Sequence, residues 1–121
     1  MPAIRRIYGY TPSAAPAIFC DRLYPRGVTK EKFAAAEWLK AIAPSAELRR
    51  WYHEDPAQHF AAFVTRYHEE LQGETQQKPV AHLLELEKQH GAVLILTAVK
   101  NPQQSHVSAL AQYLGIPFVY R

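Results

Sequence analysis

The stretch AVLILTAV, residues 92 to 99, decides the fold that this sequence predicts. It is an unbroken run of apolar and β-branched residues, and Gly91 before it ends a helical pattern. Continuous apolar runs of this length are typical of strands buried on both faces of a parallel sheet. The stretch therefore predicts a buried strand with neighbours on both sides.

Outward from this strand, apolar periodicity and capping residues divide the rest of the chain. Thr29, Ser45 and Asp55 are good N-caps, and Pro44 and Gly115 mark helix ends. The predicted helices are residues 30–42, 46–51, 56–71, 79–90 and 101–113, and the other predicted strands are residues 4–8, 17–24 and 116–120. Residues 72–78, QGETQQK, are expected to form a solvated loop.

The order of these elements predicts the fold class. Two strands, several helices, a strand, a helix and a last strand indicate helical crossovers between parallel strands. We expect an α/β fold: a small three-layer domain with a mainly parallel sheet and helices on both faces. The 121 residues fit a single domain over 1–121.

Composition narrows the class of partner. The chain has 14 basic and 11 acidic residues, a net charge of +3, and both signs are mixed along the helices. This mild excess permits an anionic ligand or nucleic acid, but it falls short of the clustered basic stripe typical of proteins that bind nucleic acid, which is therefore the less expected partner. No apolar run is long enough for a membrane helix, and one cysteine permits no internal disulfide, so a cytoplasmic location is expected.

The turn CDRLYPRG, residues 20–27, follows the predicted strand 17–24 and carries unusual charge for its position. Arg22 and Arg26 are suited to binding a phosphate or carboxylate, and Asp21 could orient one of them or act as a base. An ion pair that only fastens the strand end is the other interpretation, and both stay open. Cys20 is expected to pack in the core rather than to act as a nucleophile.

Two further segments contain candidate site residues. The loop TAVKNPQQSH, residues 97–106, ends the buried strand and leads to His106 near a helix start, where anions are favoured. The segment RRWYHEDP, residues 49–56, includes Trp51 and His53 before a helix. His53 could be an acid, a base or a ligand, whereas Asp55 reads best as a helix cap.

Several motif classes have no support in the sequence. The histidines lack zincin-type pairing with a carboxylate, so no metal site is expected. Glycine-rich phosphate loops, dinucleotide fingerprints and serine-hydrolase elbows are missing as well, and we expect no cofactor.

The ordered set of motifs resembles the YeaO-like family, a group of domains of unknown function, over nearly the whole chain. The matching residues are Asp21, Arg22, Pro25, Arg26, Gly27, Trp38, Pro44, Ser45, Leu48, Arg49, Trp51, His53, Asp55, Pro56, Phe63, Tyr67 and Leu71. The resemblance implies a small α/β domain and no established activity. The family usually has tryptophan at the position of Tyr24.

More distant relatives of that family carry a cysteine on the late strand and a Cys-His-Arg triplet at the next helix. The corresponding positions here are Thr97 and then Ser105, His106 and Val107. The resemblance therefore implies no thiol chemistry at this second loop.

Together these features predict a small cytoplasmic enzyme or enzyme-like domain that binds an anionic small molecule at the strand ends. The candidates for proton transfer are Asp21, His53 and His106, and those for substrate binding are Arg22, Arg26, Gly27, Arg49, Trp51 and Thr97. The alternative is a non-catalytic module that binds protein or nucleic acid through its basic surface.

Overall fold

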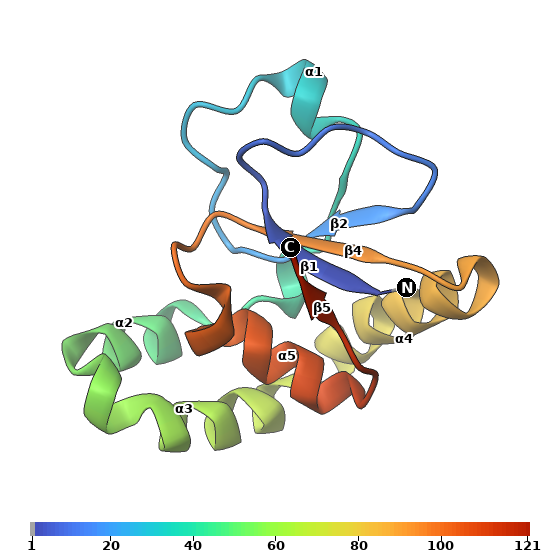
Figure 1. Ribbon diagram of the computed structural model, residues 1–121. Helices are drawn as coiled ribbons and strands as arrows, with labels where there is room; N and C mark the ends of the chain where they lie inside the picture. The colour runs from blue at the N-terminus through green and yellow to red at the C-terminus, as the bar shows by residue number, and fades with distance from the viewer. Residues whose placement is uncertain (1) are drawn as a thin grey trace.

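A five-stranded parallel sheet forms the centre of the molecule in the computed structural model, which describes residues 2–121 (Figure 1). The strands lie in the order β3-β2-β4-β1-β5. Their bounds are Ala3–Arg6 (β1), Ala17–Phe19 (β2), Glu37–Trp38 (β3), Leu94–Thr97 (β4) and Val119–Tyr120 (β5). Strand β4 lies in the middle, with Ile95 paired to Ile4 of β1 and Ile18 of β2. The predicted α/β fold with a parallel sheet is confirmed, and the stretch 92–99 supplies its central strand.

Most helices cover one face of the sheet. The helical segments are α1 (Lys30–Phe33), η1 (Lys40–Ile42), α2 (Ala46–Glu54), α3 (Pro56–Leu71), α4 (Glu74–His90), η2 (Pro102–Gln104) and α5 (His106–Leu114). Figure 1 shows α2 to α5 below the sheet, whereas α1 and the loop after β1 lie above it. The second face of this three-layer arrangement is thus covered by one short helix and loops. Within residues 2–121, no helix combines the length and apolarity needed to cross a bilayer.

Strand β2 shows how the two faces separate. Ile18 and Cys20 belong to the core between the sheet and the helices, whereas Phe19 packs in a second cluster with Phe33 and Trp38 on the other face. This alternation is the period of two that a strand imposes on its side chains. The strand itself ends at Phe19, so the predicted strand 17–24 is too long and its last five residues belong to the turn.

The predicted helix 30–42 is wrong after its first turn. Helix α1 ends at Phe33, and Glu37–Trp38 pairs with β2 as strand β3. The Trp38 ring meets Phe19 and Phe33 edge-on at centroid distances of 6.1 and 5.5 Å. Aromatic packing and sheet pairing thus outweigh the helix propensity of the intervening alanines.

The boundaries around Pro79 and Ser105 also differ from prediction. Residues 74–78 are the first turns of α4, so the expected loop is limited to a short connection, and Pro79 lies inside the helix. Because Pro79 has no N–H, the carbonyl of Thr75, four residues earlier, lacks its helical hydrogen bond. Thr75 is exposed, so water can bond this carbonyl instead. The predicted helix 101–113 divides into η2 and α5, because Ser105 forms a capping box that begins α5 at His106.

One buried hydrogen bond joins the helical layer to the segment that follows β3. The Tyr67 hydroxyl of α3 donates to the Ile42 carbonyl at 2.6 Å, and neither residue has more than a trace of exposed surface. We expect Tyr67→Phe to lower the free energy of unfolding by about 1–2 kcal/mol, because the carbonyl is left buried and unpaired.

Urea unfolding followed by circular dichroism measures this change. The matched control is Tyr113→Phe, which removes a more exposed hydroxyl bonded to Gln77 and should change stability by less than about 0.5 kcal/mol. Equal losses of stability in the two variants would contradict a stabilising role for the hydrogen bond between Tyr67 and Ile42.

Candidate functional site

The candidate site lies where β2 and β4 end side by side. The connection that follows β2 leads to β3 at one edge of the sheet, and the connection that follows β4 leads past β1 to β5 at the other edge. Between such strands the two connections diverge and leave a crevice at the carboxyl ends, which is the usual ligand position in open α/β sheets. The turn after β2 and the loop after β4 both open onto this crevice.

Asp21 is the centre of the hydrogen bonding in the crevice. Its Oδ1 accepts from the Thr97 hydroxyl at 2.7 Å, its Oδ2 accepts from the Ala98 N–H at 2.8 Å, and Nε2 of His106 lies 2.9 Å from Oδ1. The side chains of His106 and Asp21 are 12% and 13% exposed. The carboxylate therefore joins the ends of β2 and β4 to the first residue of α5.

These donors keep Asp21 charged despite its burial. Burial alone would raise the pKa of the carboxyl group, but the hydrogen bond and charge of His106, with smaller effects of the Ala98 N–H and the Thr97 hydroxyl, outweigh it. The net result is a pKa below the ordinary value of 3.8. Asp21 is accordingly an ionised acceptor at neutral pH.

Cys20 lies beside this pair and is completely buried. Its Sγ is 3.8 Å from His106 Nε2, 3.9 Å from Asp21 Oδ1 and 3.5 Å from the Leu96 carbonyl oxygen. Burial, and next the charge of Asp21, raise the pKa of the thiol well above its usual range. A protonated, enclosed thiol is a poor nucleophile, in keeping with the packing role that the sequence favoured.

A pocket of about 500 Å³ opens above the Asp21 and His106 pair. Arg22, Arg26 and Arg49 line it together with His53, and these four residues come from the turn after β2 and from α2. Its apolar wall includes Tyr8, Tyr24, Pro25, Pro44, Tyr52, Pro56 and Phe63. The structure thus brings the three predicted arginines to one cavity rather than to separate surfaces.

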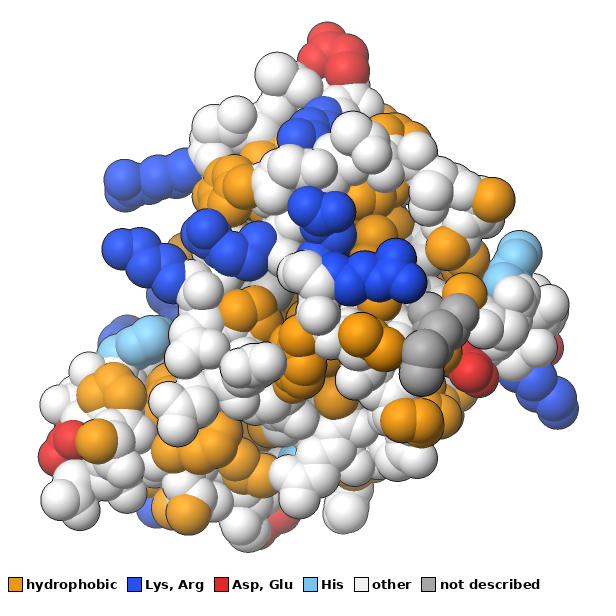
Figure 2. Space-filling view, viewed as in Figure 1, with side chains coloured by type: hydrophobic (Ala, Val, Ile, Leu, Met, Phe, Trp, Pro, Cys, Tyr) orange, Lys and Arg blue, Asp and Glu red, His pale blue; other side chains and the backbone are white. Residues whose placement is uncertain are grey.

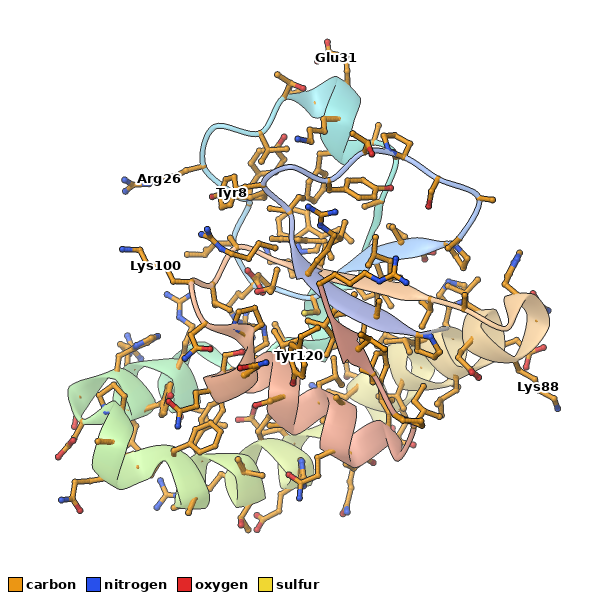
Figure 3. All side chains as sticks on the ribbon, viewed as in Figure 1. Tyr8, Arg26, Glu31, Lys88, Lys100 and Tyr120 are labelled. Atoms are coloured by element: carbon orange, nitrogen blue, oxygen red, sulfur yellow. The ribbon has the colours of Figure 1, made fainter. Side chains whose placement is uncertain are left out.

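The pocket has a basic rim on one side of the molecule. Figure 2 shows Lys and Arg side chains gathered over the upper half of this face, with few acidic groups among them. In Figure 3, Arg26 and Lys100 extend outward on the same side. Among residues 2–121, the ion pairs are Asp21 with His106 and Glu37 with His82, so no pocket arginine forms a direct ion pair with a carboxylate.

The turn after β2 is held by bonds that its sequence did not reveal. Arg22 donates through Nε to the Pro44 carbonyl at 3.0 Å, and the Trp38 indole N–H donates to the Asp21 carbonyl at 2.7 Å. Gly27 has φ of 74°, a left-handed conformation that explains a glycine in this turn. Arg22 therefore has a structural contact on one side of its guanidinium and the pocket on the other.

The remaining candidates lie at varying distances from the pocket. Thr97 is buried below it and holds Asp21. Trp51 does not line it: its ring stacks on His59 at 3.9 Å between centroids, with the Arg66 guanidinium 4.0 Å from its centroid. Gly27 also lies outside the pocket lining.

Sequence reasoning missed the tyrosine walls, Tyr8, Tyr24 and Tyr52. They come from three separate segments, and no local spacing relates them. Asn101, Gln104 and Ser105 of the loop after β4 complete the lining. The position of that loop after a predicted strand is the one sequence signal for these residues.

Comparison with known proteins assigns the family. The family model DUF488-N3i, described as "Inactive DUF488-N3 subclade", matches residues 1–118. The chain belongs to the DUF488-N3i family. The predicted YeaO-like resemblance is confirmed as well, since the chain is 37% identical to the uncharacterized protein YeaO of Escherichia coli (strain K12) over 97 residues, 80% of this chain and 81% of that protein.

Two proteins from Mycobacterium species have a comparable sequence identity to this DUF488-N3i protein. Uncharacterized proteins of Mycobacterium tuberculosis (strain ATCC 25618 / H37Rv) and Mycobacterium bovis (strain ATCC BAA-935 / AF2122/97) are each 36% identical to it over 115 residues. The match covers 93% of this chain and 92% of each relative. No solved structure matches the chain significantly.

The Asp21 network predicts an acid-sensitive contribution to stability. Because the pKa of Asp21 is lowered on folding, its contribution is complete above the ordinary carboxyl pKa of 3.8 and is lost as pH falls through the lower folded value. We expect Asp21→Asn to lower the unfolding free energy at pH 7 by about 1–3 kcal/mol and to flatten this acid limb. Urea unfolding between pH 3 and 7 measures both effects.

The other carboxylate and histidine pair provides the control. Glu37 and His82 are also 2.9 Å apart, but their side chains are 52% and 43% exposed. Glu37→Gln should therefore cost less than about 1 kcal/mol. A loss for Asp21→Asn no larger than that for Glu37→Gln would refute the central role of Asp21.

Proposed function

We propose that the chain is an enzyme-like domain that binds an anionic small molecule in the pocket above Asp21 and His106. The observation that carries this proposal is that Arg22, Arg26 and Arg49 line one cavity, and among residues 2–121 none of their nitrogens lies within 4.0 Å of a carboxylate oxygen. Unpaired arginines around a concave, partly apolar site are suited to bidentate binding of a phosphate or carboxylate.

Size and lining favour a small organic anion. A cavity of about 500 Å³ is in the usual range for metabolite sites, and its apolar wall can cover the uncharged part of a ligand. Tyrosines at the wall offer both a flat surface and a hydroxyl group. We expect the charged group of the ligand to lie at the arginines and its body against Tyr8 and Tyr52.

Binding without turnover is the form of the proposal that the site supports best. The family description carries the word "Inactive". Both carboxylate oxygens of Asp21 are engaged by the protein, and the Cys20 thiol is neutral and enclosed. His53 lines the pocket and can donate a ring N–H to a bound anion, whereas His106 Nε2 is paired with Asp21. The lone cysteine, kept reduced, suits action in the cytoplasm.

Thermal-shift measurements with defined anions test the proposal. Inorganic phosphate, pyrophosphate, phosphorylated metabolites and dicarboxylates are added to the full chain, and a binding anion raises the melting temperature by mass action. Arg49→Ala should weaken binding about tenfold, because a charged hydrogen bond is lost. Arg26→Ala, at the exposed rim, should have a smaller effect.

The neighbouring Arg50 supplies the matched control. Arg50 is exposed and does not line the pocket, so Arg50→Ala should bind the same anion as the unchanged protein does. No stabilising anion in the set, or equal losses for the two variants, would contradict the proposal. Steeply salt-dependent binding of an oligonucleotide that Arg49→Ala and Arg50→Ala weaken alike would instead favour the surface-binding alternative.

A further inference from the structure

Three ligand-type atoms converge at the floor of the crevice, although no local sequence spacing predicts a metal site. They are Sγ of Cys20, Oδ1 of Asp21 and Nε2 of His106, and all lie within 4.8 Å of one another. Two come from consecutive residues after β2, and the third is the first residue of α5. They are neighbours only because β2 and β4 pair, so no motif in the sequence shows them together.

We propose that Cys20, Asp21 and His106 form a binding site for a zinc ion whose fourth position is open to the pocket. The argument begins with distances. The three separations are 2.9, 3.8 and 3.9 Å, and a point equidistant from the three atoms lies about 2.1 Å from each. Zinc bonds to nitrogen and oxygen are about 2.0–2.2 Å and those to sulfur about 2.3 Å.

The adjustment needed to reach tetrahedral angles is small. Tetrahedral ligands at these bond lengths are about 3.3–3.6 Å apart, so Asp21 and His106 must separate by about 0.4 Å and Cys20 must approach each by a similar amount. The first change follows when the proton between Asp21 and His106 is replaced by the ion. The thiol proton leaves to solvent, and the proton on His106 Nε2 leaves or moves to Nδ1.

Charge and surroundings also fit the ion. A thiolate, a carboxylate and a neutral imidazole balance the two positive charges of zinc, so the buried site is neutral when filled. The Thr97 hydroxyl and the Ala98 N–H already donate to the Asp21 carboxylate, the type of support that orients metal-binding carboxylates. Mixed sulfur, nitrogen and oxygen donors suit zinc rather than magnesium or calcium.

The pocket gives the ion a route in and an open side. Asp21 and His106 line the pocket, whereas Cys20 lies beneath them and has no exposed surface. Three protein ligands with a fourth position toward a cavity is the arrangement of zinc sites that bind an exogenous ligand. The filled site needs no bound anion, so its test is independent of the anion proposal.

Titration of the full, chelator-treated chain with Co²⁺ is the experiment. We expect one ion per chain, tetrahedral visible absorption, and a near-ultraviolet charge-transfer band that only a thiolate ligand gives; Zn²⁺ should displace the ion and Mg²⁺ should not. Cys20→Ser should remove the charge-transfer band and weaken Zn²⁺ binding about tenfold or more, and His106→Gln should weaken it comparably.

Controls separate this site from adventitious histidine binding. His82→Gln alters the other histidine and carboxylate pair, on the surface, and should leave the cobalt spectrum and zinc affinity unchanged. Circular dichroism checks that each variant is folded. Cys20→Ala is a second variant without the thiol, and it leaves only a small buried cavity. A chain without a charge-transfer band, or unchanged zinc affinity in a folded Cys20 variant, would overturn the proposal.

Discussion

The carboxylate of Asp21 is the interaction on which the rest of the crevice depends. It accepts hydrogen bonds from the end of β4 through Thr97 and Ala98, and it pairs with His106 at the start of α5. A largely buried carboxylate is stable only when its desolvation is offset by donors, and here three donors are present. The position of the helix start, the loop after β4 and the turn after β2 are thereby linked to one side chain.

This floor contrasts with the rim of the pocket. The floor is largely buried and held by the hydrogen bonds of Asp21, whereas Arg26 is exposed and Arg49 is partly exposed, so their long side chains can adapt to a ligand. Arg22 is intermediate, because its Nε is held by the Pro44 carbonyl. If the pocket binds the anion that we propose, the adjustable arginines would select it by charge and the tyrosine walls by shape.

Much of the fold could be predicted from the sequence because the strongest indications of secondary structure were local. The apolar run around Ile95 and the capped helix from Pro56 to Leu71 follow from periodicity and end residues alone. Strand β3 could not be read, because Glu37–Trp38 is extended only through its pairing with β2 and the Trp38 packing against Phe19 and Phe33. The helix start at Pro79 was predicted wrongly, because Pro79 lies inside α4, where the carbonyl that loses its bond belongs to the exposed Thr75.

The site was predictable only in part, because local sequence signals do not show which distant residues meet. Asp21, Arg22 and Arg26 stand at a strand end, which a sequence can reveal, and His106 stands in the second loop. Their convergence with Arg49, and of Cys20 with His106, depends on long-range strand pairing. Trp51 was predicted to bind substrate because it lies near His53 in the sequence. Its ring instead stacks on His59 and lies under the Arg66 guanidinium.

The strand order has a consequence for the order of events during synthesis. Strand β1 lies between β4 and β5, with Ala3 beside Leu94 and Val119, so the first strand made pairs only with the last two. Until the ribosome has released residues 94–97, Ile4 and Ile18 lack Ile95, their partner on β4, and the helices in between have no complete sheet to cover. The sheet therefore forms through contacts of high sequence separation, which form slowly and leave apolar strands open to chaperones meanwhile.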